Sequence, residues 1–281
     1  MSRHFSMTKA QFRVNSPFSY SCPRHLSETD PDPVNILNPT SDRGVLLIAD
    51  HAGNAVPHSM KGLGLDAEDL IRHIAWDPGA ADVAAGLAQK WHATAVLAAY
   101  SRLIVDPNRP LGDASSMPEV SDGTTVPANQ NLSAEERRRR ADLFYFPYHM
   151  AVETQLARLR RLSHLPPVVS IHSFTPDFKN EDRPWHIGVM AAADRRLAEC
   201  LIRNLRQQTK LEIGDNQPYS GVEYGYTLKI HAGAQGLANT QIEIRQDLLK
   251  DAQSIPNWVN ILDAALTPLI CDPNILRIEH H

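Results

Sequence analysis

Short apolar runs that alternate with helical patterns are the feature that most constrains the fold of this 281-residue chain. Runs at residues 45–49, 95–99, 103–105, 168–171, 187–190 and 241–244 have the length and composition of buried strands. Strand and helix in alternation are typical of a sheet whose two faces are covered. We therefore expect an α/β fold with a mixed, mainly parallel central sheet and helices on both faces.

Several helices can be placed between these runs. Val83, Leu87 and Trp91 recur every four residues and so share one helical face. Ser133 and Glu136 form a capping box at the start of a helix that Pro147 is expected to bend or split. Two further helices are expected at about 194–208 and 257–270. Residues 227–231, which follow a glycine-containing loop, have a strand-like pattern.

The expected organisation is one catalytic domain between two short ends. Residues 1–43 are rich in Ser, Pro and Asp and predict an irregular surface arm. Residues 44–275 contain every strand and helix signal and form a single α/β domain. Residues 276–281 form a tail whose terminal histidines have the composition of an expression-tag remnant and are not counted as ligands. The loops at 107–132 and 176–186 are expected to set substrate choice.

Charge and hydropathy exclude two classes of partner. The formal charge is −4 and the isoelectric point is near 6.3, so the chain lacks the basic footprint of a nucleic-acid-binding protein. Neither a signal-peptide pattern nor an apolar span of about 18 residues is found, and membrane association is not expected. These observations predict a cytoplasmic protein with a small-molecule partner, and carry no signal for its oligomeric state.

Polar side chains at predicted strand ends are the best candidates for a site, because ligands of α/β sheets collect there. His51 follows the run at 45–49, and His172 follows the run at 168–171. Two imidazoles can ligate Zn²⁺, which needs three protein ligands and one open position for catalysis, but polar residues at strand ends also cap turns. Asp77, which precedes a proline, is either a helix cap or a site residue.

Glu243 is the most informative carboxylate because it interrupts an apolar strand, where an unpaired charge would be costly. It either pairs with a cation such as Arg245 or serves as a general base. Arg102 and Arg109 lie on both sides of the run at 103–105. Guanidinium groups bind carboxylates through two hydrogen bonds, although surface salt bridges are an equally simple role for both.

Several of these segments together resemble the N-formylglutamate amidohydrolase family. The similarity runs in order over about residues 44–250. It is carried by His51-Ala52-Gly53, Trp76-Asp77-Pro78-Gly79-Ala80, Ser101-Arg102, Asp106-Pro107-Asn108-Arg109, Ile171-His172-Ser173 and Ile242-Glu243-Ile244-Arg245.

The resemblance implies a fold related to zinc carboxypeptidases and phosphorylase/hydrolase-like proteins, and hydrolysis of the N-formyl or N-acyl amide of an acidic amino acid. It implies a metal-dependent enzyme with one zinc ion. The expected roles are zinc ligation by His51 and His172 with Asp77 as the third ligand, base catalysis by Glu243, oxyanion stabilisation by Arg102 or His231, and substrate binding by Asn108, Arg109 and Asn54.

Two alternatives remain at this point. Carboxypeptidase-like sites have a glutamate at the position of Asn54, and an amide is a poor zinc ligand. A non-catalytic protein that binds or senses a small acid on the same fold would explain that difference. The other alternative is a hydrolase of a different N-acyl amino acid or small peptide.

Overall fold

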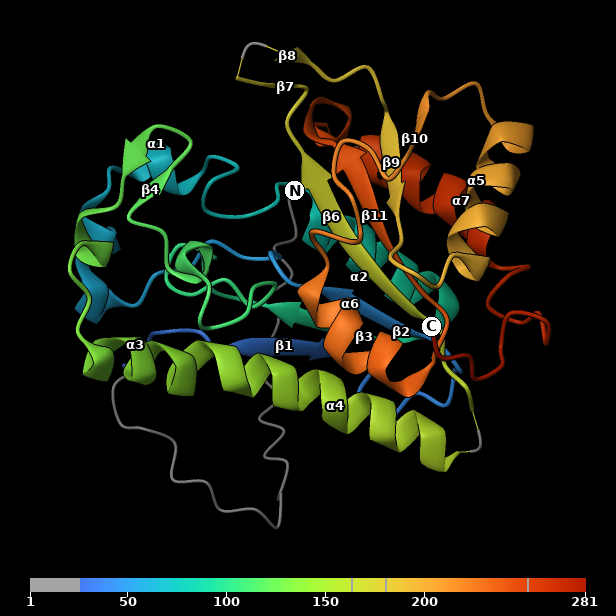
Figure 1. Ribbon diagram of the computed structural model, residues 1–281, viewed down its shortest axis with the longest axis horizontal. Coiled ribbons are helices and arrows are strands. Elements are labelled where there is room, and N and C mark those ends of the chain that lie inside the picture. The colour runs from blue at the N-terminus through green and yellow to red at the C-terminus, as the bar shows by residue number, and fades with distance from the viewer. Residues whose placement is uncertain (1–25, 163, 180, 252) are drawn as a thin grey trace, which may run out of the picture.

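A seven-stranded mixed sheet forms the centre of the computed structural model, which describes residues 26–162, 164–179, 181–251 and 253–281 (Figure 1). Neighbouring strands are parallel except in the pairs β1/β3 and β9/β11. The predicted fold class is confirmed. The strand order is β1 (Val34–Leu37), β3 (Thr94–Ala98), β2 (Leu46–Ala49), β6 (Val168–Phe174), β11 (Asn239–Arg245), β9 (Ile187–Met190) and β10 (Ile213–Asp215).

Helices cover both faces of this sheet (Figure 1). On one face, α2 (Ala80–Trp91), α5 (Arg196–Gln208) and α7 (Ser254–Leu266) pack on the largest apolar core. On the other face, α4 (Phe146–Arg161) and α6 (Tyr226–His231) pack on a second core. Alternate side chains of β2 point to opposite faces of the sheet, so Leu47 packs in the first core and Leu46 and Ile48 pack in the second.

A loop-rich lobe with its own apolar core lies beside the sheet. It contains α1 (Ala67–Leu70), α3 (Ala134–Arg140) and the hairpin of β4 (Val120–Ser121) and β5 (Thr124–Thr125). A second small hairpin, β7 (Asp177–Phe178) and β8 (Glu181–Asp182), follows β6. The remaining short helical turns are His58–Gly64, Ala114–Ser116, Pro127–Asn129, Ala141–Tyr145, Gly233–Gln235 and Gln246–Leu249.

Several predicted helices are confirmed. Ser133 caps α3 by accepting a hydrogen bond from the Glu136 backbone N–H. A π-helical turn at Ala141–Tyr145 lies between α3 and α4, directly before Phe146 and Pro147, and Pro147 has no backbone N–H to donate to that preceding turn. Within the described ranges, no helix combines the length and apolar composition needed to cross a bilayer.

Three local predictions were wrong. Residues 103–105 form turns in the core of the lobe, where the side chains of Asn129 and Arg140 bind the carbonyls of Leu103 and Ile104 in place of a strand ladder. Residues 227–231 are helical and belong to α6. Residues 34–37, inside the segment expected to be irregular, form the edge strand β1 on β3. The rest of the predicted arm, residues 1–25, lies outside the described residues.

Candidate active site

The carboxyl ends of β2, β6 and β11 carry the polar side chains of the site. These strands are mutual neighbours through β6, with Glu243 registered beside His172 and Gln241 beside Ser170. In β11 the intervening Ile242 joins the apolar core on the opposite face of the sheet. Alternation along the strands therefore places the polar residues together on the face that α4 and α6 cover.

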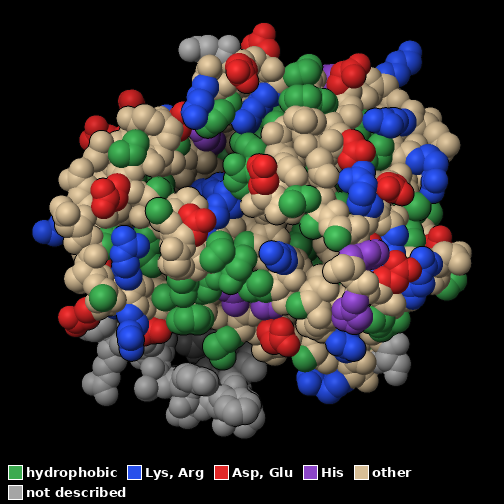
Figure 2. Space-filling view, viewed as in Figure 1, with side chains coloured by type: hydrophobic (Ala, Val, Ile, Leu, Met, Phe, Trp, Pro, Cys, Tyr) green, Lys and Arg blue, Asp and Glu red, His purple; other side chains and the backbone are tan. Residues whose placement is uncertain are grey.

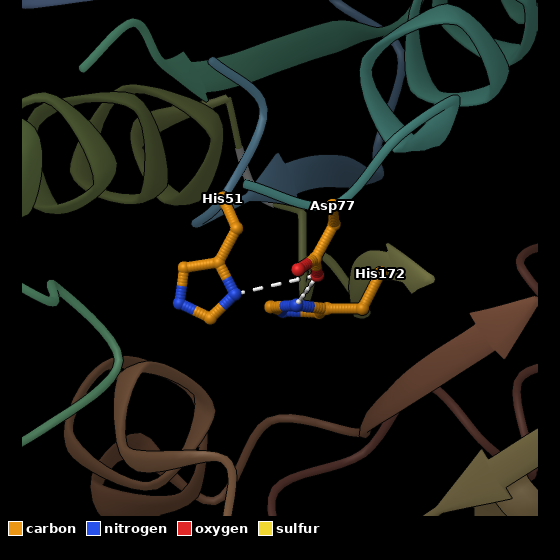
Figure 3. A group of neighbouring side chains, drawn as sticks. All are labelled: His51, Asp77 and His172. Atoms are coloured by element: carbon orange, nitrogen blue, oxygen red, sulfur yellow. Dashed lines mark hydrogen bonds and ion pairs between the residues drawn. The ribbon is translucent and has the colours of Figure 1, made fainter. Parts of the chain in front are cut away.

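His51, Asp77 and His172 form a buried group at this edge (Figure 3). The Nδ1 atoms of His51 and His172 lie 3.3 and 2.7 Å from the same oxygen, Oδ2 of Asp77. The two imidazole rings meet edge to face, with centroids 4.9 Å apart. One ligand atom from each of the three residues lies within 4.8 Å of the others, so the group could hold a metal ion.

A separate carboxylate holds the far side of each imidazole ring. The Nε2 atom of His51 lies 2.8 Å from Asp106 Oδ1, and that of His172 lies 3.0 Å from Asp50 Oδ2. A histidine that ligates a metal through one nitrogen usually donates its other N–H to a carboxylate, which fixes the tautomer. Both rings therefore have the support that metal ligation through Nδ1 requires.

The buried charges of the site are predominantly negative. Asp50, Asp77, Asp106 and Glu243 are all buried, whereas Arg102 is the guanidinium that pairs with two of them. Burial alone lowers the pKa of His172, but its hydrogen bonds to Asp50 and Asp77 outweigh this effect and raise it well above the usual value. A surplus of anionic groups favours a bound cation at this position.

The carboxylate of Asp77 is held in the ionised form. Burial raises its pKa, but the charges and hydrogen bonds of His51 and His172 outweigh burial and hold the pKa well below the ordinary value. The Asp77 backbone N–H donates to the His51 carbonyl at 2.9 Å, which ties the two segments together. Gly79 has φ of 80° and a Cβ there would lie 2.7 Å from Leu249, so the turn after Asp77 requires glycine.

Glu243 lies beside the group without a salt bridge to a guanidinium among the described residues. Its Oε1 accepts a hydrogen bond of 2.8 Å from the Gln241 side-chain amide. Burial raises the pKa of Glu243 to about 6, with the charge of His172 opposing the rise. Arg245, the structural partner considered from the sequence, pairs with Asp247 instead.

Arg102 reaches into the site from the loop after β3. Its Nη2 atom donates to Asp106 Oδ2 at 2.5 Å, and its Nη1 atom lies 3.2 Å from His51 Nδ1 and 3.8 Å from Asp77 Oδ1. The backbone N–H of Arg102 donates to the Ala75 carbonyl, which links this loop to the segment before Asp77. The guanidinium is thus placed next to the possible metal position.

The other predicted site residues have different surroundings. The Asn54 side chain donates to the Leu70 carbonyl, and the Asn108 side chain accepts from the Thr227 backbone N–H at the start of α6. Arg109 lies over the Tyr224 ring, 5.0 Å from its centroid. His231 does not join the metal group; it contacts His149 at 2.9 Å and Glu153 at 3.3 Å.

Sequence reasoning gave no role to several residues that the structure brings to the site. Asp50 stands directly before His51, and Asp106 lies between buried Val105 and buried Pro107. The rule that selected His51, a polar side chain at a strand end, would have selected Asp50 as well. Gln241 gave no comparable signal, because its importance depends on its hydrogen bond to Glu243, which the fold supplies.

Comparison with known proteins identifies the family of this chain. The sequence matches the N-formylglutamate amidohydrolase family over residues 43–250. The gene product Atu2144 of Agrobacterium tumefaciens is 35% identical, with a TM-score of 0.82, and the match covers 88% of this chain and 99% of that one. The N-formylglutamate amidohydrolase from Ralstonia eutropha JMP134 shares the fold at 18% identity, with a TM-score of 0.62 and coverage of 85% and 97%. No curated protein matches the chain. The chain therefore belongs to the N-formylglutamate amidohydrolase family and is a hydrolase that acts on amide bonds.

Proposed function

We propose that this protein is a zinc-dependent amidohydrolase that removes the N-formyl group, or another small N-acyl group, from an acidic amino acid such as N-formylglutamate. The observation that carries the proposal is the buried group of His51, Asp77 and His172 beside Glu243. Family membership supports the amide-hydrolase class, and the side chains support the metal and the catalytic roles.

The donor atoms fit zinc. Two imidazole nitrogens and one carboxylate oxygen are a common ligand set of catalytic zinc sites, which leave one position open. Mg²⁺ and Ca²⁺ prefer oxygen ligands, so the two histidines favour a transition metal or zinc. When bound, zinc would polarise the scissile carbonyl and make a water molecule more acidic.

The surrounding side chains would carry out the remaining steps. Glu243, with its pKa raised by burial, would accept a proton from the attacking water and deliver it to the leaving amine nitrogen. Arg102, next to the imidazole of His51, would stabilise negative charge that develops on the carbonyl oxygen. Arg109 would bind a substrate carboxylate. Asn108 would hold the loop that carries Arg109 against the start of α6, where its side chain accepts from the Thr227 N–H.

The structure offers no support for the non-catalytic alternative. That alternative rests on Asn54 in place of a ligating glutamate, but Asp77 supplies a carboxylate to the group and Asn54 binds a backbone carbonyl elsewhere. In our proposal Asn54 orients the loop after His51, and His231 contacts His149 and Glu153 rather than the metal group.

A substrate panel tests the proposal. Zinc-loaded protein would be mixed with N-formyl and N-acetyl derivatives of glutamate, aspartate, glutamine and methionine, and release of the free amino acid would be followed. We expect the highest kcat/KM with N-formylglutamate. Turnover confined to neutral N-acyl amino acids would refute the acidic substrate, and no turnover of any member would refute the amidohydrolase proposal.

A further inference from the structure

Arg183 is a buried cation for which the described part of the chain provides no anionic partner. Only 9% of its surface is exposed, and it lies in the segment after β8. Its Nη1 atom donates to Tyr219 Oη at 3.0 Å and to Thr175 Oγ1 at 3.2 Å. The described residues place no salt bridge on this guanidinium, although burying an unpaired charge is costly.

Aromatic rings fix the plane of this guanidinium. Its central carbon lies 4.8 Å from the ring centroids of both Phe178 and Tyr219 and 5.8 Å from that of Phe174. The Nε and Nη2 atoms have no hydrogen-bond partner among the described residues. These atoms form one edge of the planar group, and two parallel N–H donors on such an edge match the two oxygens of a carboxylate.

Tyr219 connects Arg183 to the active site. Burial raises the pKa of the Tyr219 hydroxyl and the nearby charges of Glu243 and Asp77 add to the rise, whereas the charge and hydrogen bond of Arg183 oppose it. The Tyr219 ring also contacts the Tyr224 ring, with centroids 5.5 Å apart, and Tyr224 lies under the guanidinium of Arg109. The two tyrosines thus lie between two guanidiniums, and Arg109 too has no carboxylate partner among the described residues.

These two guanidiniums differ in their connection to the metal group. The Arg109 backbone N–H donates to the Asp106 carbonyl, and the Asp106 carboxylate holds His51. Arg183 instead follows the β7–β8 hairpin, beyond the end of β6. In Figure 2 the surface is hollowed between the loop-rich lobe and the β6–β7 edge, with Lys or Arg side chains at the wall. The Tyr219–Tyr224 pair links the two guanidiniums, which places Arg183 and Arg109 in one neighbourhood.

We propose that Arg183 binds the side-chain carboxylate of the substrate while Arg109 binds the α-carboxylate, so that Arg183 selects N-acyl dicarboxylic amino acids over neutral ones. This inference rests on the proposed function and names the residue that would set its specificity. Phe178 and Tyr219 act as positioning residues that hold the guanidinium in one plane. The substrate carboxylate supplies the anion that the buried guanidinium lacks.

The first test compares two substrates that differ in one group. N-formyl-L-glutamate and N-formyl-L-glutamine have the same shape, but only the first has a charged side chain. We expect Arg183→Met to lower kcat/KM for the glutamate derivative by about 100-fold, because one partner of a buried charge pair is lost, and to leave the glutamine derivative within about threefold. Arg183→Lys should fall between, since it keeps the charge without the planar edge. Arg206→Met, on the exposed side of α5, is the matched control.

A binding measurement keeps the inference separate from the proposed reaction. Glutarate carries two carboxylates and no amide, and butyrate carries one carboxylate, so calorimetric binding of both needs no turnover. We expect glutarate to bind wild-type protein more tightly than butyrate, and Arg183→Met to abolish this preference. Equal losses for both substrates, or a preference for glutarate that survives the substitution, would overturn the assignment of Arg183. If wild-type protein prefers glutarate and Arg183→Met abolishes that preference, but wild-type protein hydrolyses no substrate, the proposed reaction alone is overturned.

Discussion

In the proposed mechanism, Glu243 is the residue on which the chemical step depends most. It is buried, lies beside His172 in the sheet register and has a pKa raised to about 6 by burial. Glu243→Gln keeps the shape and one acceptor oxygen for the Gln241 amide but removes the basic carboxylate. We expect kcat to fall by about 10²- to 10⁴-fold while zinc content and the unfolding temperature stay near wild type. A variant with near wild-type turnover would show that another group is the base.

The pKa of Glu243 also predicts the pH profile. A general base acts as the carboxylate, so kcat/KM should decrease as the pH falls through the pKa of Glu243. The N–H donor of Gln241 favours the charged form and lowers that pKa. Gln241→Leu removes the donor and should move the acidic limb of the profile up by roughly 0.5 to 1 pH unit. An unchanged limb would indicate that Glu243 does not control it.

At the level of single residues, the sequence predicted the centre of the candidate site better than its surroundings. His51, His172 and Glu243 could be selected because each is a polar residue at or in an apolar strand. Asp50 contacts His172, which lies 122 positions away in the chain, and Asp106 contacts His51, which lies 55 positions away. Such contacts follow from strand order and loop path, which the local pattern does not contain.

Among the structural elements, the turn after β2 packs directly against the backbone that follows β3. A Cβ on Gly53 would lie 2.1 Å from the Ala99 carbonyl oxygen, whereas one on Gly112 would meet no atom within 4 Å. Gly53→Ala should therefore separate the segments after β2 and β3, which carry His51 and Arg102. We expect a loss of about 1 to 3 kcal/mol of stability together with weaker zinc binding.

Gly112→Ala is the matched control for this prediction. Chemical denaturation and zinc titration of both variants would measure the two effects. We expect Gly112→Ala to resemble wild type in both measurements. If Gly53→Ala unfolds at the same denaturant concentration as Gly112→Ala, the close approach of the two segments does not constrain the fold.

The elements that were predicted wrongly show what the pattern lacks. Leu103, Ile104 and Val105 have strand-forming side chains, but side chains of Asn129 and Arg140 bind two of their carbonyls in a core outside the sheet. Residues 226–231 form a helix because Thr227 has a partner for its N–H in Asn108. In both segments, partners distant in the sequence decided the backbone conformation.

On the scale of the whole molecule, the mainly parallel sheet brings the carboxyl ends of β2, β6 and β11 to one edge and gathers four buried carboxylates there. A bound divalent cation would offset the repulsion among them, so metal binding should also stabilise the fold. Zinc at about 100 times its dissociation constant would add about 2.7 kcal/mol to the free energy of unfolding. The unfolding temperature should rise with zinc and should not rise in His172→Ala.

The central claim, a catalytic zinc held by His51, Asp77 and His172, is tested most directly by formate release from N-formylglutamate after metal removal. Protein without terminal histidines would be treated with a chelator, dialysed and then supplied with zinc. The account predicts that activity is lost with the metal and returns at about one zinc per chain. Turnover that persists in protein free of metal would contradict it.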